Sequence, residues 1–271
     1  SLEKIVLNLP WPKNPSVIFT SNSFQFCEPF QMWAAKKVES GSKLIIGQHG
    51  GFYGSGRWHC GEKHQVKIAD KFISWGWRDN RSSIVRGSVL TNIGKTINKW
   101  DNNGSLLFVT MPVRLISYKD ITWPIGPNQA LSFLNDQMKF IDAISNDCKE
   151  SLIVRINKKQ DEKMRSLYLK KIKESSKQLI IDDSSTPIEN QIKKCRVFVY
   201  SCNSTGYLET LARGIPTVIF WDPGLFELRD SAKPFFDKLK VVGILHYDPI
   251  SAANHISKHW NNIENWWLDA K

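Results

Sequence analysis

Short apolar runs alternate with amphipathic segments along the chain, and this alternation is typical of an α/β protein. The runs are rich in β-branched and aromatic residues, as fully buried parallel strands are. Apolar positions recur at helical spacing in many of the segments between them. Strands are predicted at 16–20, 43–47, 71–77, 86–90, 106–110, 152–156, 179–182, 197–200, 217–221 and 241–245. Helices are predicted at 28–40, within 61–72, and at 128–145, 163–175, 187–194, 205–213 and the Trp-rich C-terminus.

The chain is organised around residues 197–221, which read as a strand, a polar turn, a helix and a second strand. Small polar residues interrupt the first apolar run, and Ser204 or Thr205 is placed to cap the helix. Gly214 ends that helix and Pro216 prevents it from resuming before the second strand begins. This β-α-β unit predicts a parallel sheet with a crossover helix.

The polar turn of this unit has the chemistry of an anion site. Free backbone N–H groups and the positive end of the helix dipole bind phosphates or carboxylates at such helix starts. Hydroxyls of Ser201, Ser204 and Thr205 would add donors, and Glu209, one turn into the helix, would accept from a sugar or ribose hydroxyl. The alternative is that the Ser and Thr residues only cap a crossover helix.

A glycine-rich loop directly after the strand at 43–47 is the second candidate site. In open α/β sheets, ligands bind beyond the carboxyl ends of strands, where this loop lies. Its glycines allow a ligand to approach the backbone, and His49 would donate to a phosphate or transfer a proton. The alternative is a glycine turn with an incidental histidine, since neither GxGxxG nor a P-loop is present. The candidate binding residues of this loop are Gly50, Gly51, Tyr53 and Gly54.

Titratable residues follow the glycine-rich loop. Glu62 is a candidate general acid or base, and the alternative is a solvated glutamate at a helix start. His59, Glu62 and His64 do not form the HExxH pattern, so no metal site is predicted.

Two arginines are candidate clamps for a phosphate or carboxylate, because a planar guanidinium suits bidentate recognition. Arg155 lies inside the apolar run LIVRI, and Arg114 lies in the long loop after the strand at 106–110. A charge in a buried strand needs a partner, so an internal ion pair is the alternative for Arg155.

The 271 residues carry a formal net charge of +11, which favours an anionic partner such as a nucleotide, a phosphorylated lipid or a membrane surface. The basic residues are concentrated only in a mixed-charge helical segment at 158–177, which we interpret as a solvated face. No nucleic-acid-binding motif accompanies it, and nucleic acid is not an expected partner.

Five scattered cysteines without CxxC spacing indicate reduced thiols. The chain has neither a long apolar span nor a secretory signal pattern, so we expect a cytoplasmic protein. A polar stretch with Asn102, Asn103 and Gly104 predicts a boundary between an N-terminal lobe at 1–98 and a C-terminal lobe at 99–271.

Several motifs in series resemble one family over most of the chain. They are QHGGFYG, KIADKFISWGW, STGYLETLARGIPTVIFW, LRDSAKPFFDKLKVVGILH and WNNIENWW. The series is similar to a family of bacterial transferases of surface-carbohydrate (O-antigen type) biosynthesis, and the third motif resembles the donor-nucleotide half of GT-B glycosyltransferases. Family members are longer, so this chain is expected to be a C-terminal portion. The resemblance assigns shared positions to His49, Gly50, Gly51, Tyr53 and Gly54, and to Ser204, Thr205, Leu208 and Glu209.

The resemblance implies two Rossmann-like lobes of mostly parallel sheet flanked by helices, in a GT-B-like arrangement. It implies a metal-independent glycosyltransferase of surface polysaccharide or lipopolysaccharide synthesis, with no cofactor and a nucleotide sugar as donor substrate. The expected acceptor is a glycan or a lipid-linked glycan, reached at the cytoplasmic face of the inner membrane. The alternatives are a polyol-phosphate-type transferase, a nucleotide-sugar epimerase, or a non-catalytic carbohydrate-binding domain.

Overall fold

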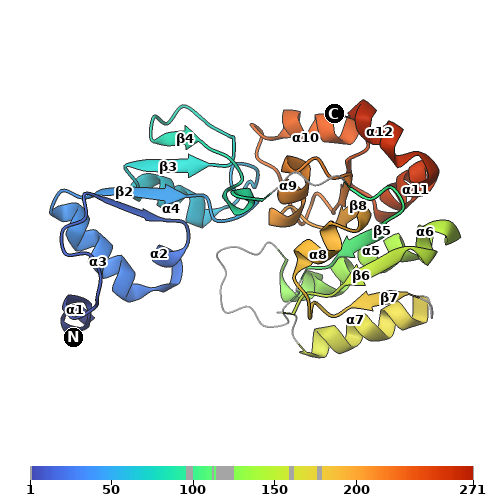
Figure 1. Cartoon of the computed structure of the whole chain (residues 1–271), viewed down its shortest axis with the longest axis horizontal. Coiled ribbons are helices and arrows are strands. Elements are labelled where there is room, and N and C mark those ends of the chain that lie inside the picture. Colours follow the sequence, from blue (N-terminus) through green and yellow to red (C-terminus); the bar gives the residue numbers. More distant parts are fainter. Residues whose placement is uncertain are drawn as a thin grey trace. The chain divides into compact units, whose positions relative to one another are not determined.

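The computed structural model describes residues 2–95, 100–111, 113, 125–158, 162–175 and 179–270. The chain divides into two compact units, each with its own parallel sheet (Figure 1). Unit 1 comprises Ser1–Gly54 and His59–Ile93, and unit 2 comprises Ser55–Trp58 and Gly94–Lys271. The lobe boundary was expected between residues 98 and 99. These two positions lie outside the described residues, so the boundary stays a prediction.

Unit 1 contains a four-stranded parallel sheet in the order β1-β2-β3-β4. Its strands are β1 (Val17–Thr20), β2 (Lys43–Gly47), β3 (Lys71–Ser74) and β4 (Ile84–Arg86). Its helices are α1 (Leu2–Leu7), α2 (Ser23–Phe26), α3 (Glu28–Glu39), α4 (Cys60–Ile68) and the 3₁₀ turn η1 (Leu90–Asn92).

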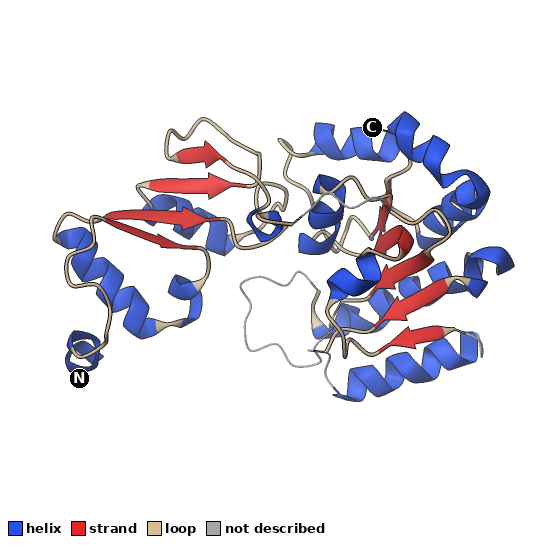
Figure 2. Ribbon diagram, viewed as in Figure 1, coloured by secondary structure: helices blue, strands red, loops and turns tan. Residues whose placement is uncertain are grey.

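Helices α3 and α4 pack against the sheet of unit 1, and α1 and α2 pack against α3 (Figure 2). The strands follow one another in chain order, so right-handed crossovers place α3 and α4 on the same face. On that face Ile46 and Phe72 are fully buried. On the other face, Val17 is 53% and Phe19 is 56% exposed, so the described residues leave the β1 part of this face open.

Unit 2 contains a six-stranded parallel sheet in the order β10-β9-β8-β5-β6-β7. Its strands are β5 (Ser105–Val109), β6 (Leu152–Arg155), β7 (Ile180–Asp182), β8 (Cys195–Tyr200), β9 (Thr217–Phe220) and β10 (Leu245–His246). Its helices are α5 (Ala130–Ala143), α6 (Asn146–Glu150), α7 (Glu162–Ser175), α8 (Ile188–Ile192), α9 (Thr205–Ala212), α10 (Lys233–Val241), α11 (Pro249–His259) and α12 (Ile263–Ala270), with 3₁₀ turns η2 (Pro127–Gln129) and η3 (Trp260–Asn262).

The chain builds this sheet outward from the centre in both directions. It runs from β5 to the edge at β7, returns to place β8 beside β5, and then continues to the opposite edge at β10. The central strands are apolar runs with buried side chains, as the sequence predicted. Phe108, Phe140 and Phe220 pack together at centroid distances of 4.9 to 5.9 Å in the core.

The C-terminal tryptophans pack against unit 2. The Trp266 indole N–H donates to the carbonyl of Val242 (2.9 Å), and that of Trp267 donates to the carbonyl of Gly214 (3.0 Å). Both rings are buried. Their polar edges are therefore used by the fold, which leaves only ring surface for other contacts.

Some strand predictions were wrong in their bounds. The strand expected at 241–245 is reduced to β10, because α10 continues to Val241 and ends at Gly243, whose φ is +76°. The strand expected at 71–77 ends at Ser74, since the backbone N–H of Trp75 donates to the Gln48 side chain instead of a neighbouring strand. The α/β class with parallel sheets flanked by helices is confirmed.

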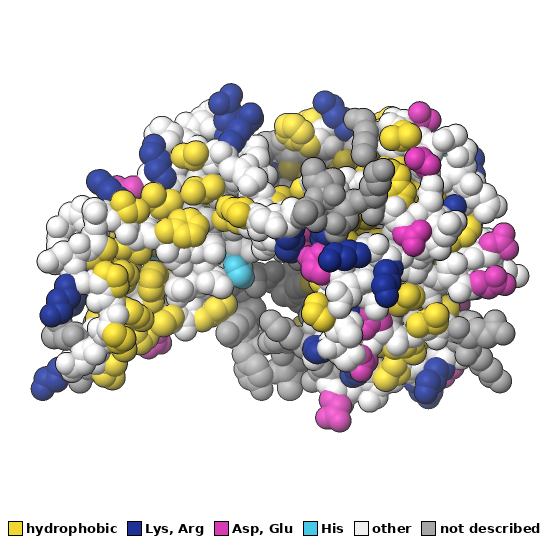
Figure 3. All heavy atoms as spheres, in the orientation of Figure 1, with side chains coloured by type: hydrophobic (Ala, Val, Ile, Leu, Met, Phe, Trp, Pro, Cys, Tyr) yellow, Lys and Arg dark blue, Asp and Glu magenta, His cyan; other side chains and the backbone are white. Residues whose placement is uncertain are grey.

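Basic side chains are scattered over the face drawn in Figure 3. Among the described residues of that face they form no continuous stripe. The absence of nucleic acid among the partners stays a prediction.

Candidate functional site

The carboxyl ends of β5 and β8 lie side by side where the strand order of unit 2 reverses, with Val109 opposite Tyr200. Read from β7, the order of the sheet is the 3-2-1-4-5-6 order of dinucleotide-binding folds. Ligands of open α/β sheets bind in the crevice beyond such a switch point. The loop after β8 therefore lies where a ligand site is expected.

This loop is buried and only partly satisfied by hydrogen bonds. Ser201, Cys202 and Asn203 are each at most 2% exposed. The Ser201 hydroxyl has no hydrogen-bond partner among the described residues. Burial raises the pKa of the Cys202 thiol well above its usual range, so this thiol is neutral and unsuited to act as a nucleophile.

Helix α9 begins directly after the loop. Ser204 is its N-cap residue, and its side chain makes no capping hydrogen bond. Its hydroxyl instead interacts with that of Tyr200. Thr205 is the first helical residue and, like Ser204, is partly exposed. The first N–H groups of a helix lack intrahelical acceptors, and a helix start of this kind can bind an anion.

The start of α9 is packed closely on Tyr200. A side-chain carbon at Gly206 would lie 3.0 Å from the Tyr200 ring, so a larger residue would push the two apart. Burial raises the pKa of Tyr200 well above its usual range, and Glu209 adds to that effect. Glu209 is itself half-buried, so the predicted residues of this loop and helix form one contiguous group.

Asn203 holds the loop in place, a role that the sequence analysis missed. The Tyr207 hydroxyl donates to its Oδ1 (2.9 Å), and its Nδ2 donates to the Ser55 hydroxyl (3.2 Å). Asn203 is 2% exposed, so both bonds are shielded from water. An asparagine in the short loop between a buried strand and a helix start was the available signal.

Residues Ser55–Trp58 belong to unit 2 although they follow the glycine-rich loop in sequence. Gly56 forms an antiparallel bridge with Leu228. The Arg57 N–H donates to the Glu227 carbonyl (2.9 Å), and their side chains form an ion pair (2.8 Å). This short segment therefore joins the loop after β9 to the loop after β8, at the same edge of the sheet.

Arg155 forms the internal ion pair that the sequence left open as an alternative. Its Nη1 donates to Asp182 Oδ2 (2.5 Å) and its Nη2 donates to the Thr186 carbonyl (2.7 Å). Both side chains of the pair are 8% exposed. The guanidinium is thus occupied by protein groups. Arg114, the other predicted clamp, lies outside the described residues.

A cavity of about 460 Å³ lies at the carboxyl ends of β6 and β7, near the switch point. Arg155, Lys158 and residues 184–188 line it. The Ser184 hydroxyl donates to the Ile156 carbonyl (2.7 Å), which fixes the loop after β7. Such a cavity, with one ammonium group and several hydroxyls, suits a polar ligand.

The glycine-rich loop of unit 1 is organised by Gln48, a second residue without a predicted role. Gln48 is 1% exposed and its Nε2 donates to the Gly50 carbonyl (2.6 Å). Its Oε1 accepts from the Trp75 backbone N–H and from the Trp77 indole, both at 2.8 Å. This amide therefore ties the loop to the segment that follows β3.

Glu62 is also used within this loop. Its carboxylate accepts from the Gly54 N–H (2.7 Å), and its side chain is only 4% exposed. The solvated alternative is therefore wrong. His59 Nδ1 accepts from the Glu62 N–H (2.9 Å) and caps α4. Among the described residues, no group of three metal-ligating side chains is placed to hold an ion, and metal independence stays a prediction.

His49 and Tyr53 differ in exposure although only three residues separate them. His49 is exposed. Tyr53 is 6% exposed, and its hydroxyl accepts from Gln65 (2.7 Å) and Gln25 (3.3 Å). Burial raises the pKa of Tyr53. The structure thus places Tyr53 in the core of unit 1, while His49 is accessible to a substrate.

The sequence profile of the LIC12162 family of transferases matches residues 2–271. No functionally curated protein matches the chain. Among solved structures, a protein assigned as UDP-N-acetylglucosamine 2-epimerase from Listeria monocytogenes is similar with a TM-score of 0.55 and 10% identity, over 100% of this chain and 70% of that one. This similarity concerns the fold alone, and it agrees with the GT-B-like class.

Two further structures are more distant. WaaG, a glycosyltransferase involved in lipopolysaccharide biosynthesis, has a TM-score of 0.40 and 8% identity, over 96% of this chain and 71% of that one. A trehalose 6-phosphate synthase from Burkholderia multivorans has a TM-score of 0.47 and 8% identity, over 99% of this chain and 68% of that one. With TM-scores below 0.5, neither structure assigns a fold or a function to this chain. Within the described part of the chain, no helix has the length and apolar character needed to span a membrane.

Proposed function

The chain belongs to the LIC12162 family of transferases, and we propose on this premise that it transfers a sugar from a nucleotide-sugar donor. The acceptor is a glycan or a lipid-linked glycan of bacterial surface polysaccharide or lipopolysaccharide synthesis, reached at the cytoplasmic face of the inner membrane. One observation carries the proposal: a hydroxyl-rich loop and a helix start occupy the switch point of the unit 2 sheet.

The donor diphosphate binds at the start of α9 in this proposal. Its charge faces the free N–H groups and the positive end of the helix dipole. Ser204 and Thr205 add hydroxyl donors. A buried hydroxyl without a partner costs stability, and a bound phosphate or an ordered water would satisfy that of Ser201. Glu209 accepts from a hydroxyl of the ribose or the sugar.

The nucleoside occupies the cavity at the ends of β6 and β7. Lys158 supplies a positive charge at its wall, and its Nζ lies 3.4 Å from the Ser185 carbonyl oxygen. Arg155 shapes this wall through its ion pair with Asp182. Arg114 is proposed as a further phosphate ligand from the sequence alone.

Sugar transfer breaks the bond between the anomeric carbon and the diphosphate while an acceptor hydroxyl forms a new bond to that carbon. The departing diphosphate gains negative charge, which α9 and the loop hydroxyls stabilise without a metal or cofactor. His49, exposed on the glycine-rich loop, takes the proton of the acceptor hydroxyl. Glu62 holds the backbone of that loop through Gly54. The sequence predicted Glu62 as an acid or base, and the proposal gives it a positioning role instead.

The test is a thermal-shift titration with UDP, GDP, CDP, CMP and dTDP and their sugar conjugates. A ligand at about 100 times its Kd stabilises the folded state by about 2.7 kcal/mol, so one nucleotide class should raise the Tm. The double variant Ser204→Ala and Thr205→Ala should lose this shift. Ser231→Ala, at an exposed serine outside the loop, is the matched control and should keep it.

The outcome that contradicts the proposal is full nucleotide affinity in the folded double variant, or glycan binding without nucleotide binding. The latter would indicate a carbohydrate-binding domain. Incubation with the selected donor but no acceptor tests for an epimerised sugar nucleotide. A donor panel that includes polyol-phosphate nucleotides identifies the transferred group.

A further inference from the structure

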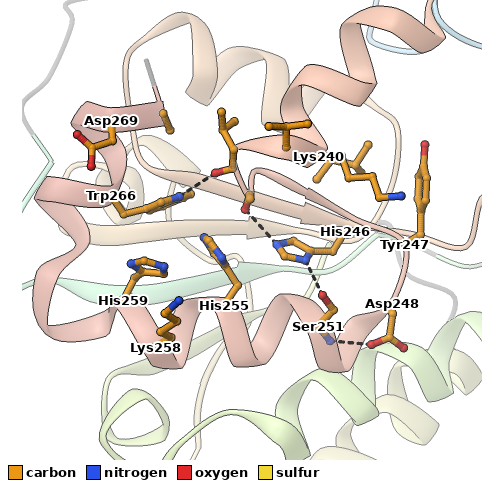
Figure 4. A pocket seen from close by; sticks show the side chains of 15 residues that line it. Lys240, His246, Tyr247, Asp248, Ser251, His255, Lys258, His259, Trp266 and Asp269 are labelled. Atoms are coloured by element: carbon orange, nitrogen blue, oxygen red, sulfur yellow. Dashed lines mark hydrogen bonds between the residues drawn. The ribbon is translucent and has the colours of Figure 1, made fainter.

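A cavity of about 780 Å³ opens on unit 2, away from the switch point (Figure 4). Its walls are the last turn of α10, strand β10, and helices α11 and α12. Strand β9 separates β10 from β8, so this cavity is not part of the proposed donor site. Its volume is in the range of small-ligand sites and is ample for a monosaccharide.

The cavity wall is fixed by specific contacts. His246 Nε2 is 3.0 Å from the Gly243 carbonyl oxygen and its Nδ1 is 2.9 Å from the Ser251 hydroxyl. Asp248 accepts from the Ser251 N–H (2.7 Å) and caps α11. The His255 ring lies against Gly243, where any side-chain carbon would come within 2.2 Å of it. The positions of these rings are therefore set by the fold.

Basic groups predominate around the cavity. The titratable groups that line it come from all four elements. They are Lys240 of α10; His246, Tyr247 and Asp248 of β10 and the turn after it; His255, Lys258 and His259 of α11; and Asp269 of α12. His255 is the centre of a row of imidazoles, 5.2 Å from the His246 centroid and 4.7 Å from that of His259.

Several donors of this wall are not used by the protein. Within the described residues, neither Lys240 nor Lys258 forms an ion pair with a carboxylate, and Lys240 Nζ instead lies 5.0 Å from the Tyr247 ring centroid. The imidazoles of His255 and His259 make ring contacts but no hydrogen bonds there. Unpaired ammonium groups together with imidazole N–H donors suit an oxyanion.

Two aromatic side chains, Tyr247 and Trp266, also line the cavity. Trp266 packs against His255 at 4.9 Å, and its indole N–H is already bound to the Val242 carbonyl. Trp266 is 8% exposed, so only an edge of its ring reaches the cavity, whereas Tyr247 is half-buried and offers more ring surface. Flat aromatic surface beside hydrogen-bonding carboxylates, here Asp248 and Asp269, suits the apolar faces and hydroxyls of a sugar. The described residues place no three side chains to hold a metal ion, so the histidine row is not a metal site.

We propose that this cavity binds an acidic carbohydrate, a saccharide that carries a carboxylate or a phosphate, as a site separate from donor binding. The oxyanion lies against Lys258 and the histidine row, and the sugar ring contacts the exposed edge of Trp266. Burial, together with His246, His259 and Lys258, lowers the pKa of His255 to about 4. A bound anion opposes this effect, so binding is coupled to proton uptake and tightens as the pH falls.

The experiment is calorimetric titration of the whole chain with galacturonate, glucose 6-phosphate and glucose. It is run at about pH 6 and about pH 8, on either side of the ordinary histidine pKa. One or both acidic sugars should bind, at least about fivefold more tightly at the lower pH, and glucose should bind at least about tenfold more weakly. The acid that binds identifies the oxyanion as carboxylate or phosphate.

The variant Lys258→Gln should weaken acidic-sugar binding at least about tenfold, since it removes one charge-assisted contact. Lys238→Gln, on α10 but outside the cavity wall, is the matched control and should change it by less than about twofold. Histidine side-chain NMR provides a second readout, in which the acidic sugar should raise the pKa of His255. The proposal is overturned if neither acid binds, if glucose binds equally well, or if the two lysine variants behave alike.

Discussion

The glycine-rich loop of unit 1 and the hydroxyl-rich loop of unit 2 both follow the carboxyl end of a buried parallel strand. In unit 1, the side chains of Gln48 and Glu62 form hydrogen bonds with the backbone of the loop, and Gln48 also bonds to the segment after β3. In unit 2, the Ser201 hydroxyl has no partner among the described residues, and Ser204 makes no capping bond. The polar side chains named in the unit 1 loop have protein partners, whereas the unit 2 loop retains the unpartnered Ser201 hydroxyl.

This difference separates two uses of polar residues that look alike in sequence. A buried polar atom with a protein partner rigidifies the fold, and its removal costs stability. A buried polar atom without one is a candidate for ligand binding, and its removal should cost affinity instead. Variants in the two loops should therefore divide into those that change unfolding and those that change nucleotide binding.

The largest effect is expected from Gly54→Ala in the unit 1 loop. Gly54 has a φ of +71°, and an added carbon would lie 2.5 Å from the Trp77 ring. Left-handed backbone strain and overpacking together should destabilise the protein by about 3 kcal/mol, measured by urea unfolding. Gly76→Ala is the control, because Gly76 has a φ of +94° but no atom within 4 Å of an added carbon. Equal losses of unfolding free energy in the two variants would show that overpacking against Trp77 adds nothing to the backbone strain.

The next effect is expected from Glu62→Ala. The Gly54 N–H would lose its acceptor within a buried site, at a cost of about 2 kcal/mol in unfolding free energy. Glu62→Gln keeps an acceptor oxygen and should retain most of the stability and transfer activity. If Glu62→Gln is stable but transfers no sugar, Glu62 is a catalytic acid or base and the positioning role is wrong.

Acid should affect unit 2 through its histidine row. The folded pKa of His255 is lowered to about 4 from an ordinary 6.5, so the unfolded chain binds more protons between these values. Stability should therefore fall as the pH drops through this window, by about 1 to 2 kcal/mol after allowance for solvent screening of a partly exposed ring. His255→Leu should flatten this dependence in urea unfolding followed across the window. An unchanged slope would show that another group titrates.

The smallest stability effect is expected from Ser201→Ala, which removes the unpartnered hydroxyl. The unfolding free energy should change by less than about 0.5 kcal/mol, whereas the Kd for the donor nucleotide should rise about fivefold. Ser184→Ala is the contrasting variant, because that hydroxyl donates to the Ile156 carbonyl and its loss should cost about 1 kcal/mol. The comparison of the two loops fails if Ser201→Ala destabilises the protein and leaves affinity intact.

The sequence predicted the sheets well because buried parallel strands are continuous apolar runs, and those of β5, β6, β8 and β9 could be read directly. The weak points were strand ends. The sequence placed Val241 in a strand, but α10 continues through it because its lysines and Val241 face solvent there, and only Gly243 ends the helix. Solvent exposure of an apolar residue is a tertiary property that local patterns do not contain.

The candidate site was predictable where residues are neighbours in sequence. Ser201, Ser204, Thr205 and Glu209 lie on one loop and helix, so the strand-loop-helix pattern was sufficient to group them. The partner of Arg155 could not be chosen from sequence, because Asp182 reaches it through the register of β6 and β7. The bond between Asn203 and Ser55 spans 148 positions, and no local pattern indicates it.

The attachment of Ser55–Trp58 to unit 2 has a consequence for how this protein can be divided. The C-terminal unit is not one continuous piece of sequence, since four of its residues are encoded within the first half. A recombination event, a split gene or a truncation that keeps only the later residues would leave Asn203 without Ser55 and Leu228 without its bridge to Gly56. An exchange of unit 2 between relatives should therefore preserve its fold only when this tetrapeptide moves with it.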